Sequence, residues 1–298
     1  MNENSPYPQP PKALIGKDNW LFLHNDTNHV VKQHTGEMLL SELGVQAWCS
    51  TLETRNNWLR NRSIDYFFLV PPDSHAVYPE FLPDDIHPAA IRPIFQVSQK
   101  LAQITDLQLI YPLDALKSKK SEMLVCHDTD SHWTHFGAYI AYVEVMQQIK
   151  NKYPNVRILS RDDITFYEEE FIGDLGNKFN PERKGTTVLG RINNPQAQLI
   201  SDNGIVNRGN ISVYENPDKS LPRAVFLRDS YGMWLSPFFA ESFSHLTVVA
   251  SPLMEYDIVE SAQPDIVISE TSERFFYQPP DDVNGEKAAE LAAAKKLE

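Results

Sequence analysis

The sequence predicts an α/β fold in which a mostly parallel sheet is covered by helices. Short apolar runs typical of buried strands alternate with helical segments, and each predicted strand ends where polar residues begin. Of the 298 residues, 42% are apolar, which is enough to bury one large α/β core or two small ones. We expect one domain over residues 14–280, an N-terminal extension over residues 1–13 and a flexible tail over residues 281–298.

The first half of the chain alternates predicted strands with amphipathic helices. A helix is expected at Ser41–Arg60, where apolar side chains recur at helical intervals. A buried strand is expected at Asp65–Val70, because a continuous apolar run is stopped there by Pro71 and Pro72. The other predicted elements are the strand Trp20–Leu23, the helix Ile91–Ile104, the strand Leu107–Tyr111 and the helix Phe136–Tyr153.

The alternation breaks between residues 160 and 220, where the sequence is polar and rich in Gly and Asn. We expect an insertion or lid beside the main sheet, with one hairpin that pairs Ala197–Ser201 with Asn210–Tyr214. The alternation then returns with the strand Arg223–Leu227, the helix Tyr231–Ala240, the strand Leu246–Ala250, the helix Met254–Ser261 and the strand Asp265–Ser269.

Charge and cysteine content exclude several classes of protein. The formal net charge is -13, so the long-range field repels polyanions and nucleic acid is not an expected partner. Cys49 and Cys126 have no metal-ligand spacing and form no disulfide framework, and Cys49 lies on an apolar helix stripe. There is no apolar run of about 18 residues and no signal peptide, so we expect a soluble chain.

A serine stands where an open α/β sheet places reactive groups. The predicted strand Arg223–Leu227 is followed by Arg228, Asp229 and Ser230, at the turn from a strand into a helix. There the Ser230 hydroxyl can act as a nucleophile, and its own N–H can donate to an oxyanion. The alternative is an ordinary helix N-cap, for which Ser and Asp are preferred residues.

A possible base for this serine lies in the loop before the predicted helix Phe136–Tyr153. A serine needs an imidazole to take its proton, and the imidazole needs a carboxylate to fix its tautomer. His132 and Asp130 supply both groups, and Trp133 beside them suits a wall packed on a sugar or an imidazole. The competing interpretation is a metal site, because further possible ligands lie nearby: His127, Asp128, His135 and Glu144.

Six short motifs occur in a characteristic order: GKDNWLFL, PPDSHAVYPEFLP, DTDSHWTHFGA, GDL, FLRDSYG and PDIVISETSERFF. Over about residues 14–277 this ordered set resembles the catalytic domain of the alginate O-acetyltransferase (AlgX/AlgJ, DHHW-like) family. The resemblance implies an SGNH/GDSL-hydrolase-like (flavodoxin-like) fold in permuted motif order, with Ser230, His132 and Asp130 as the catalytic triad. It also implies acetylation of bacterial exopolysaccharides outside the cytoplasm, with a membrane-bound O-acyltransferase that delivers the acetyl group.

The sequence departs from the family pattern at three positions. Arg228 stands where a GDS-type motif has glycine, Tyr231 follows the serine, and Ser74 replaces a lysine found in many relatives. We predict that Arg228, Tyr231 and Trp133 contact the substrate. In the last motif, we consider an internal ion pair among three charged residues: Glu270, Glu273 and Arg274.

We expect an O-acetyltransferase that forms an acetyl-serine intermediate and transfers the acetyl group to a polysaccharide or oligosaccharide. An acetylesterase would use the same triad and transfer the acetyl group to water. A third alternative, suggested by Arg228, is a non-catalytic carbohydrate-binding component of a polysaccharide-export system. We expect no cofactor and no metal; the resemblance implies a periplasmic location, although the sequence itself leaves a cytoplasmic one open.

Overall fold

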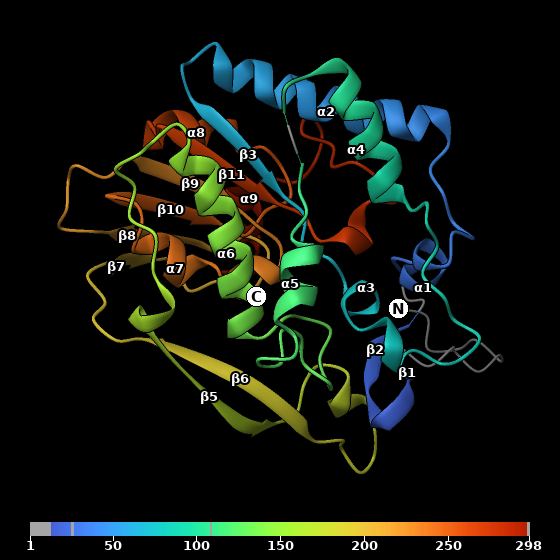
Figure 1. Ribbon diagram of the computed structural model, residues 1–298. Helices are drawn as coiled ribbons and strands as arrows, with labels where there is room; N and C mark the ends of the chain where they lie inside the picture. The colour runs from blue at the N-terminus through green and yellow to red at the C-terminus, as the bar shows by residue number, and fades with distance from the viewer. Residues whose placement is uncertain (1–12, 25–26, 108, 297–298) are drawn as a thin grey trace.

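The computed structural model describes residues 13–24, 27–107 and 109–296, and it contains a seven-stranded central sheet (Figure 1). Neighbouring strands follow the order β4-β3-β11-β9-β10-β8-β7. The first five strands are parallel to one another, β8 pairs antiparallel with β10, and the edge strand β7 pairs antiparallel with β8. The parallel strands are β4 (Leu109–Ile110), β3 (Asp65–Leu69), β11 (Ile266–Glu270), β9 (Arg223–Leu227) and β10 (His245–Val249). This architecture confirms the predicted α/β class.

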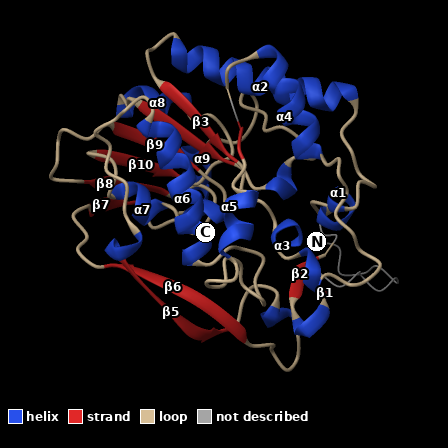
Figure 2. Ribbon diagram, in the orientation of Figure 1, coloured by secondary structure: helices blue, strands red, loops and turns tan. Residues whose placement is uncertain are grey.

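Helices cover both faces of the central sheet (Figure 2). Successive residues of β9 alternate between two cores: Ala224 and Phe226 pack on one face, and Val225 and Leu227 on the other. One core contains α5 (Leu113–Lys119), α6 (His135–Lys150) and α7 (Ser236–Ala240), and the other contains α2 (Glu42–Arg60), α4 (Pro93–Ile104) and α8 (Tyr256–Ala262). Because side chains cover both faces, the strands are continuous apolar runs, which is why they were predictable.

The predicted helix Tyr231–Ala240 is wrong in one respect. The segment forms a 3-10 turn at Tyr231–Met233, and α7 begins only at Ser236. Pro237 accounts for the break, because it has no N–H to donate to the carbonyl four residues earlier and so is tolerated only in the first turn of a helix. Ser230 is consequently followed by a tight turn rather than a long helix.

The polar region from residue 160 to residue 220 divides into two parts. β5 (Ile164–Phe171) and β6 (Gly185–Ile192) form a separate antiparallel ribbon, seen at the bottom of Figure 1. β7 (Gln198–Asp202) and β8 (Ile211–Glu215) form the predicted hairpin, but they extend the central sheet rather than lying beside it. A function of this region as a lid stays a prediction.

Short elements complete the described part of the chain. Of the predicted N-terminal extension, only Ala13 is described, and it begins β1 (Ala13–Ile15), which pairs with β2 (Leu21–Leu23). The remaining helices are α1 (Val30–His34), α3 (Ser74–Val77) and α9 (Ala288–Lys295). The other 3-10 turns are Lys17–Asn19, Pro79–Phe81, Arg161–Asp163, Gly176–Lys178 and Glu273–Phe275. No helix within the described ranges is long and apolar enough to cross a membrane.

The C-terminal segment packs on the domain. Asp282 forms a bidentate ion pair with the buried guanidinium of Arg55, with N···O distances of 2.6 and 2.7 Å. Ala288 and Ala292 of α9 are also buried. The sequence predicts little burial after Pro280, and these contacts show that the segment buries more than predicted.

Candidate active site

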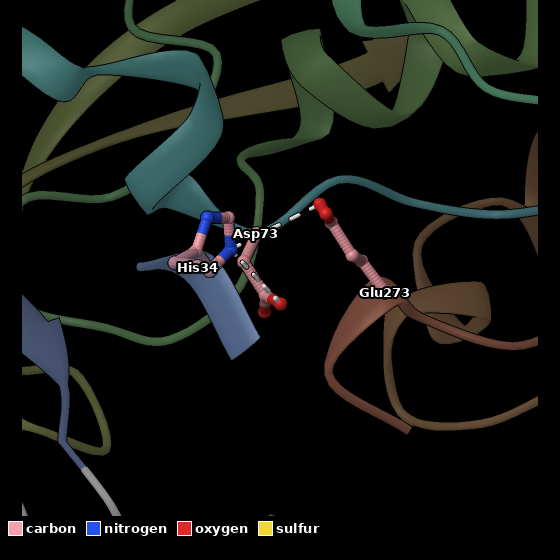
Figure 3. Close-up of side chains that lie close together, drawn as sticks. All are labelled: His34, Asp73 and Glu273. Atoms are coloured by element: carbon pink, nitrogen blue, oxygen red, sulfur yellow. Dashed lines mark ion pairs between the residues drawn. The ribbon is translucent and has the colours of Figure 1, made fainter. Parts of the chain in front are cut away.

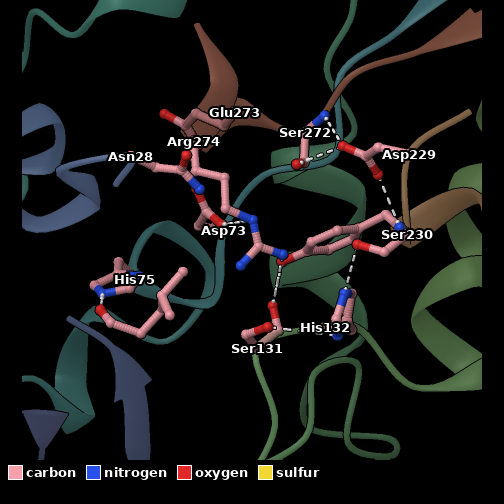
Figure 4. Close-up of polar contacts among 12 residues, drawn as sticks. Asn28, Asp73, His75, Ser131, His132, Asp229, Ser230, Ser272, Glu273 and Arg274 are labelled. Atoms are coloured by element: carbon pink, nitrogen blue, oxygen red, sulfur yellow. Dashed lines mark hydrogen bonds and ion pairs between the residues drawn. The ribbon is translucent and has the colours of Figure 1, made fainter. Parts of the chain in front are cut away.

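Ser230 lies at the carboxyl end of β9, in the turn before η5 (Tyr231–Met233), and its side chain is exposed. Its hydroxyl makes no capping hydrogen bond to the turn, which excludes the alternative of an ordinary N-cap. Asp229 takes that role, since its Oδ1 accepts from the Tyr231 N–H at 2.8 Å. The Ser230 hydroxyl is therefore free of the backbone and faces His132 (Figure 4).

The loop before α6 holds His132 and Asp130 in line with Ser230. His132 Nε2 lies 2.8 Å from Ser230 Oγ, and His132 Nδ1 lies 2.7 Å from Asp130 Oδ1. The carboxylate accepts the Nδ1 proton, so the Nε2 lone pair faces the serine hydroxyl. His132 lies 98 residues before Ser230 and 2 residues after Asp130 in the chain, and the fold brings the three together. This is the geometry in which a serine hydroxyl can be activated.

Asp130 is fixed by three N–H donors. His132 donates its backbone N–H to Oδ1 at 2.9 Å in addition to its ring N–H, and Asp174 donates its backbone N–H to Oδ2 at 2.7 Å. Burial alone raises the pKa of Asp130, but the hydrogen bond and charge of His132, with the Asp174 N–H, outweigh burial and lower this pKa well below its usual value. Asp130 is therefore a carboxylate at neutral pH.

The GDL motif explains how Asp174 reaches the loop. A Cβ atom at Gly173 would clash with the Thr129 carbonyl and the Asp130 side chain, so only glycine permits this approach. The Asp174 carboxylate in turn accepts from the backbone N–H and the hydroxyl of Ser131, both at 2.7 Å. The two loops therefore lock each other around Asp130.

A second carboxylate, Asp229, fixes the serine turn. Its Oδ2 accepts from the backbone N–H of Ser272 at 2.8 Å and from the Ser272 hydroxyl at 2.7 Å (Figure 4). Its own N–H donates to Glu270 Oε2 at 2.9 Å. Burial, followed by the nearby charge of Asp229, raises the pKa of Glu270 well above its usual value, which favours a neutral Glu270.

Tyr231 and Trp133 pack behind this arrangement. Both side chains are buried, the Tyr231 ring centroid lies 5.0 Å from that of His132, and its hydroxyl donates to the Ser131 carbonyl at 2.7 Å. Trp133 Nε1 donates to the Tyr231 carbonyl at 3.0 Å. We expected Tyr231 and Trp133 to contact the substrate. The structure differs from this expectation, because neither side chain lines a cavity at Ser230.

The predicted ion pair among Glu270, Glu273 and Arg274 does not form. Arg274 lies 3.6 Å from Asp73 and places its guanidinium over the Tyr231 ring at 4.9 Å, whereas Glu273 pairs with Arg92 at 2.9 Å. Arg274 also donates to the Ser131 carbonyl at 3.3 Å, so it supports the loop that carries His132.

The metal alternative stays a prediction, although no group of converging ligand atoms in the described ranges contains His127, Asp128, His135 or Glu144. Asp128 accepts from the Thr186 N–H, and His135 lies against the Gly190 backbone, so these side chains do not converge. In the described ranges, two other groups could hold a metal by position: His34, Asp73 and Glu273 (Figure 3), and Asp130, His132 and Asp174. The first group already pairs with two arginines, and hydrogen bonds engage the second.

Two cavities meet at Ser230. The first, of about 490 Å³, is lined in part by aromatic and proline side chains of the C-terminal segment, including Phe275, Tyr277 and Pro279. The second, of about 530 Å³, is lined by His132 together with polar and aromatic residues contributed mainly by the 160–220 region and the turn after Ser230. Its members include Phe171, Asp202, Asn210, Tyr214 and Trp234.

A mostly parallel sheet with a Ser-His-Asp arrangement at its carboxyl edge has the geometry of proteins that transfer acyl groups through a serine. Residues 13–198 match the model of the family described as SGNH hydrolase-like domain, acetyltransferase AlgX, so the chain belongs to this family and is an SGNH-type acetyltransferase. The matched range includes Asp130 and His132 and ends before Ser230, which only the fold brings to them.

Solved structures share this fold at low sequence identity. PatB1 of Bacillus cereus is 16% identical with a TM-score of 0.63, covering 91% of this chain and 98% of its own. The O-acetyltransferase domain of Pseudomonas putida AlgJ is 17% identical with a TM-score of 0.61, and the match covers 96% of this chain and 99% of the AlgJ domain. Pseudomonas aeruginosa AlgX is 14% identical with a TM-score of 0.52, covering 94% of this chain and 65% of AlgX. No curated protein matches the sequence.

Proposed function

We propose that the chain is an O-acetyltransferase that modifies hydroxyl groups of a bacterial polysaccharide through an acetyl-Ser230 intermediate. The observation that carries this proposal is the hydrogen-bonded line from Ser230 Oγ through His132 to Asp130, with distances of 2.8 and 2.7 Å. An exposed hydroxyl with an imidazole on one side and open cavities around it fits covalent catalysis better than a binding module.

The first half-reaction loads the serine. His132 Nε2 takes the proton of Ser230 as Oγ attacks the acetyl carbonyl carbon, and the carbonyl oxygen becomes an oxyanion. When the tetrahedral intermediate collapses, the bond to the leaving group breaks and the imidazolium returns its proton to that group. Asp130 stays ionised throughout and stabilises the imidazolium.

The second half-reaction runs the same steps in reverse with a sugar hydroxyl. The hydroxyl gives its proton to His132 Nε2 and attacks the acetyl-serine carbonyl, which releases Ser230 with its proton restored. The polar and aromatic lining of the second cavity suits a sugar ring, since hydroxyls find hydrogen-bond partners and ring faces find aromatic surfaces. We propose that the 160–220 region selects the acceptor.

Membership of the AlgX acetyltransferase family supports a proposal for the donor and for the compartment. We propose an acetyl donor delivered by a membrane-bound O-acyltransferase, and a periplasmic location.

Competition between a sugar and water for the acetyl-enzyme tests the proposal. The protein is incubated with 4-nitrophenyl acetate and a series of oligosaccharides, and mass spectrometry measures acetylated sugar against free acetate. Sugar O-acetylation that increases with acceptor concentration at the expense of acetate supports the transferase. Turnover to acetate alone, unchanged by every acceptor, would identify an acetylesterase instead.

A further inference from the structure

Three residues in the described ranges line both cavities at Ser230: Ser230 itself, Arg228 and Asn207. A group common to both cavities lies where they meet, which is also where the carbonyl carbon of a bound acetyl group must lie. Asn207 is exposed and belongs to the β7–β8 loop, where its backbone has a φ of 61°. Arg228 precedes Ser230 by two residues and belongs to the same segment after β9.

Arg228 forms no ion pair within 4 Å in the described part of the chain, although the carboxyl groups of Glu270, Asp229 and Asp202 lie near enough to interact with its charge. Its Nη1 donates to a neutral acceptor, the Asp229 carbonyl, at 3.1 Å, and its Nε is buried without a hydrogen-bond partner. The Asp229 carboxylate is occupied by Ser272 and the Tyr231 N–H, and the nearby Glu270 favours its neutral form. A buried guanidinium N–H without an acceptor costs stability unless an acceptor forms beside it, as an oxyanion on Ser230 would.

The guanidinium is also held in place. A Cβ atom at Gly232 would lie 2.5 Å from Arg228 Cβ and 2.9 Å from its Cδ, so the arginine stem packs directly against this glycine. The hydrogen bond to the Asp229 carbonyl fixes the head group at the other end. Donors that are oriented before the reaction stabilise a developing charge most effectively, because they need no reorganisation.

We propose that Arg228 donates to the acetyl oxygen of the tetrahedral intermediate and, with the Ser230 N–H, forms the oxyanion site. This inference rests on the proposed function and extends it, since it names a further catalytic residue. The alternative ligand for Arg228 is a carboxylate on an acceptor sugar, and a cation that binds such a carboxylate should line the acceptor cavity alone. A position between the two cavities instead suits the acetyl oxygen, which occupies the same place with either the donor leaving group or the sugar attached.

The test uses a neutral acetyl ester, so that no ligand carboxylate is present. Stopped-flow release of 4-nitrophenol from 4-nitrophenyl acetate gives the acetylation rate constant, and mass spectrometry confirms that the acetyl group is on Ser230. We expect Arg228→Gln to lower this rate constant about 10²- to 10³-fold while the ester concentration for half-maximal rate changes little. Arg228→Lys keeps a charge but loses the planar fork, and we expect a loss of at least about tenfold.

Arg60→Gln is the matched control, since it makes the same substitution at an exposed arginine that lines neither cavity, and we expect its rate constant to lie within about threefold of the parent. Thermal unfolding of each variant verifies folding, and Arg228→Lys decides the question if Arg228→Gln does not fold. Parent-like acetylation in a folded Arg228 variant would overturn this inference and leave the proposed function intact. Absence of a Ser230 adduct in the parent would overturn the proposed function, and this inference with it.

Discussion

Asp130→Asn is the perturbation whose consequences the structure defines most fully. Asp130 accepts three N–H groups: two from His132 on Oδ1, and one from Asp174 on Oδ2. Asparagine has one acceptor oxygen in place of two, and its amide group is a donor. In either orientation of the new side chain, the amide group therefore faces an N–H donor.

The two orientations have different consequences. If the oxygen faces His132, the Asp174 N–H loses its partner, which costs about 1–3 kcal/mol of folding stability. If the oxygen faces Asp174, the amide donates to His132 Nδ1 and forces the proton onto Nε2, where it faces Ser230 and prevents base catalysis. We expect this tautomer to lower the acetylation rate about 10⁴-fold, equivalent to about 5.5 kcal/mol of activation free energy.

Stopped-flow kinetics with 4-nitrophenyl acetate measures this change, and calorimetry measures the accompanying loss of stability. Asp174→Asn is the control, because it keeps the backbone N–H to Asp130 and alters only the contacts to Ser131. We expect less than about a tenfold loss for the control. An Asp130→Asn enzyme that acetylates at more than about one tenth of the parent rate would refute the role assigned to Asp130.

Three further predictions concern the frame around the site. Gly232→Ala places a Cβ against the Arg228 stem, so we expect a lower melting temperature together with an acetylation rate at least about tenfold lower; parent-like values of both would contradict the packing. Asp282→Ala leaves the buried Arg55 guanidinium without its ion pair, and urea unfolding should show a loss of about 3–5 kcal/mol; a loss below about 1 kcal/mol would contradict it. Burial lowers the pKa of three histidines from 6.5 to about 4, 3 and 4, so they stay neutral when folded: His34, His75 and His127. Because their folded pKa values lie below the unfolded value, their contribution to stability is present above pH ~6.5 and is lost as the pH falls toward ~4. Each should therefore contribute about 1.4 kcal/mol less at pH ~5.5 than at pH ~7.5, and His127→Gln should remove about one third of the combined difference.

The parts of the fold with simple patterns were predictable from sequence. β9 and β11 are continuous apolar runs bounded by polar residues, and α2 has a regular apolar stripe after the N-cap Ser41. The ribbon β5–β6 was missed, because β5 carries exposed charged residues at Glu168–Glu170 and shows no regular alternation. Its pairing with β6 is a tertiary outcome that local pattern does not encode.

The site was predictable only in part. Standard chemistry pointed to Ser230, His132 and Asp130 as a group, and the structure brings them within hydrogen-bond distance. The contributions of Asp174 and Ser272 depend on contacts between distant loops. Asp174 lies 44 residues after its partner Asp130, and Ser272 lies 43 residues after its partner Asp229. The GDL and SETSERFF motifs were visible signals for these loops, but sequence could not say which groups they would contact.

Aromatic neighbours were the other failure. Trp133 and Tyr231 stand next to reactive residues in the chain, and that adjacency suggested contact with substrate. The structure instead buries both rings, which contact each other with 5.1 Å between their centroids. Their hydrogen bonds to loop carbonyls indicate that they position His132 rather than bind ligand.

The central claim is that Ser230, activated by His132, carries the acetyl group. Intact-protein mass spectrometry after incubation with 4-nitrophenyl acetate, followed by peptide mapping, tests it in the parent, Ser230→Ala and His132→Ala. We expect a single acetyl group on Ser230 of the parent and none in either variant over the same time. An adduct that maps to another residue, or that persists in Ser230→Ala at the parent level, would contradict it.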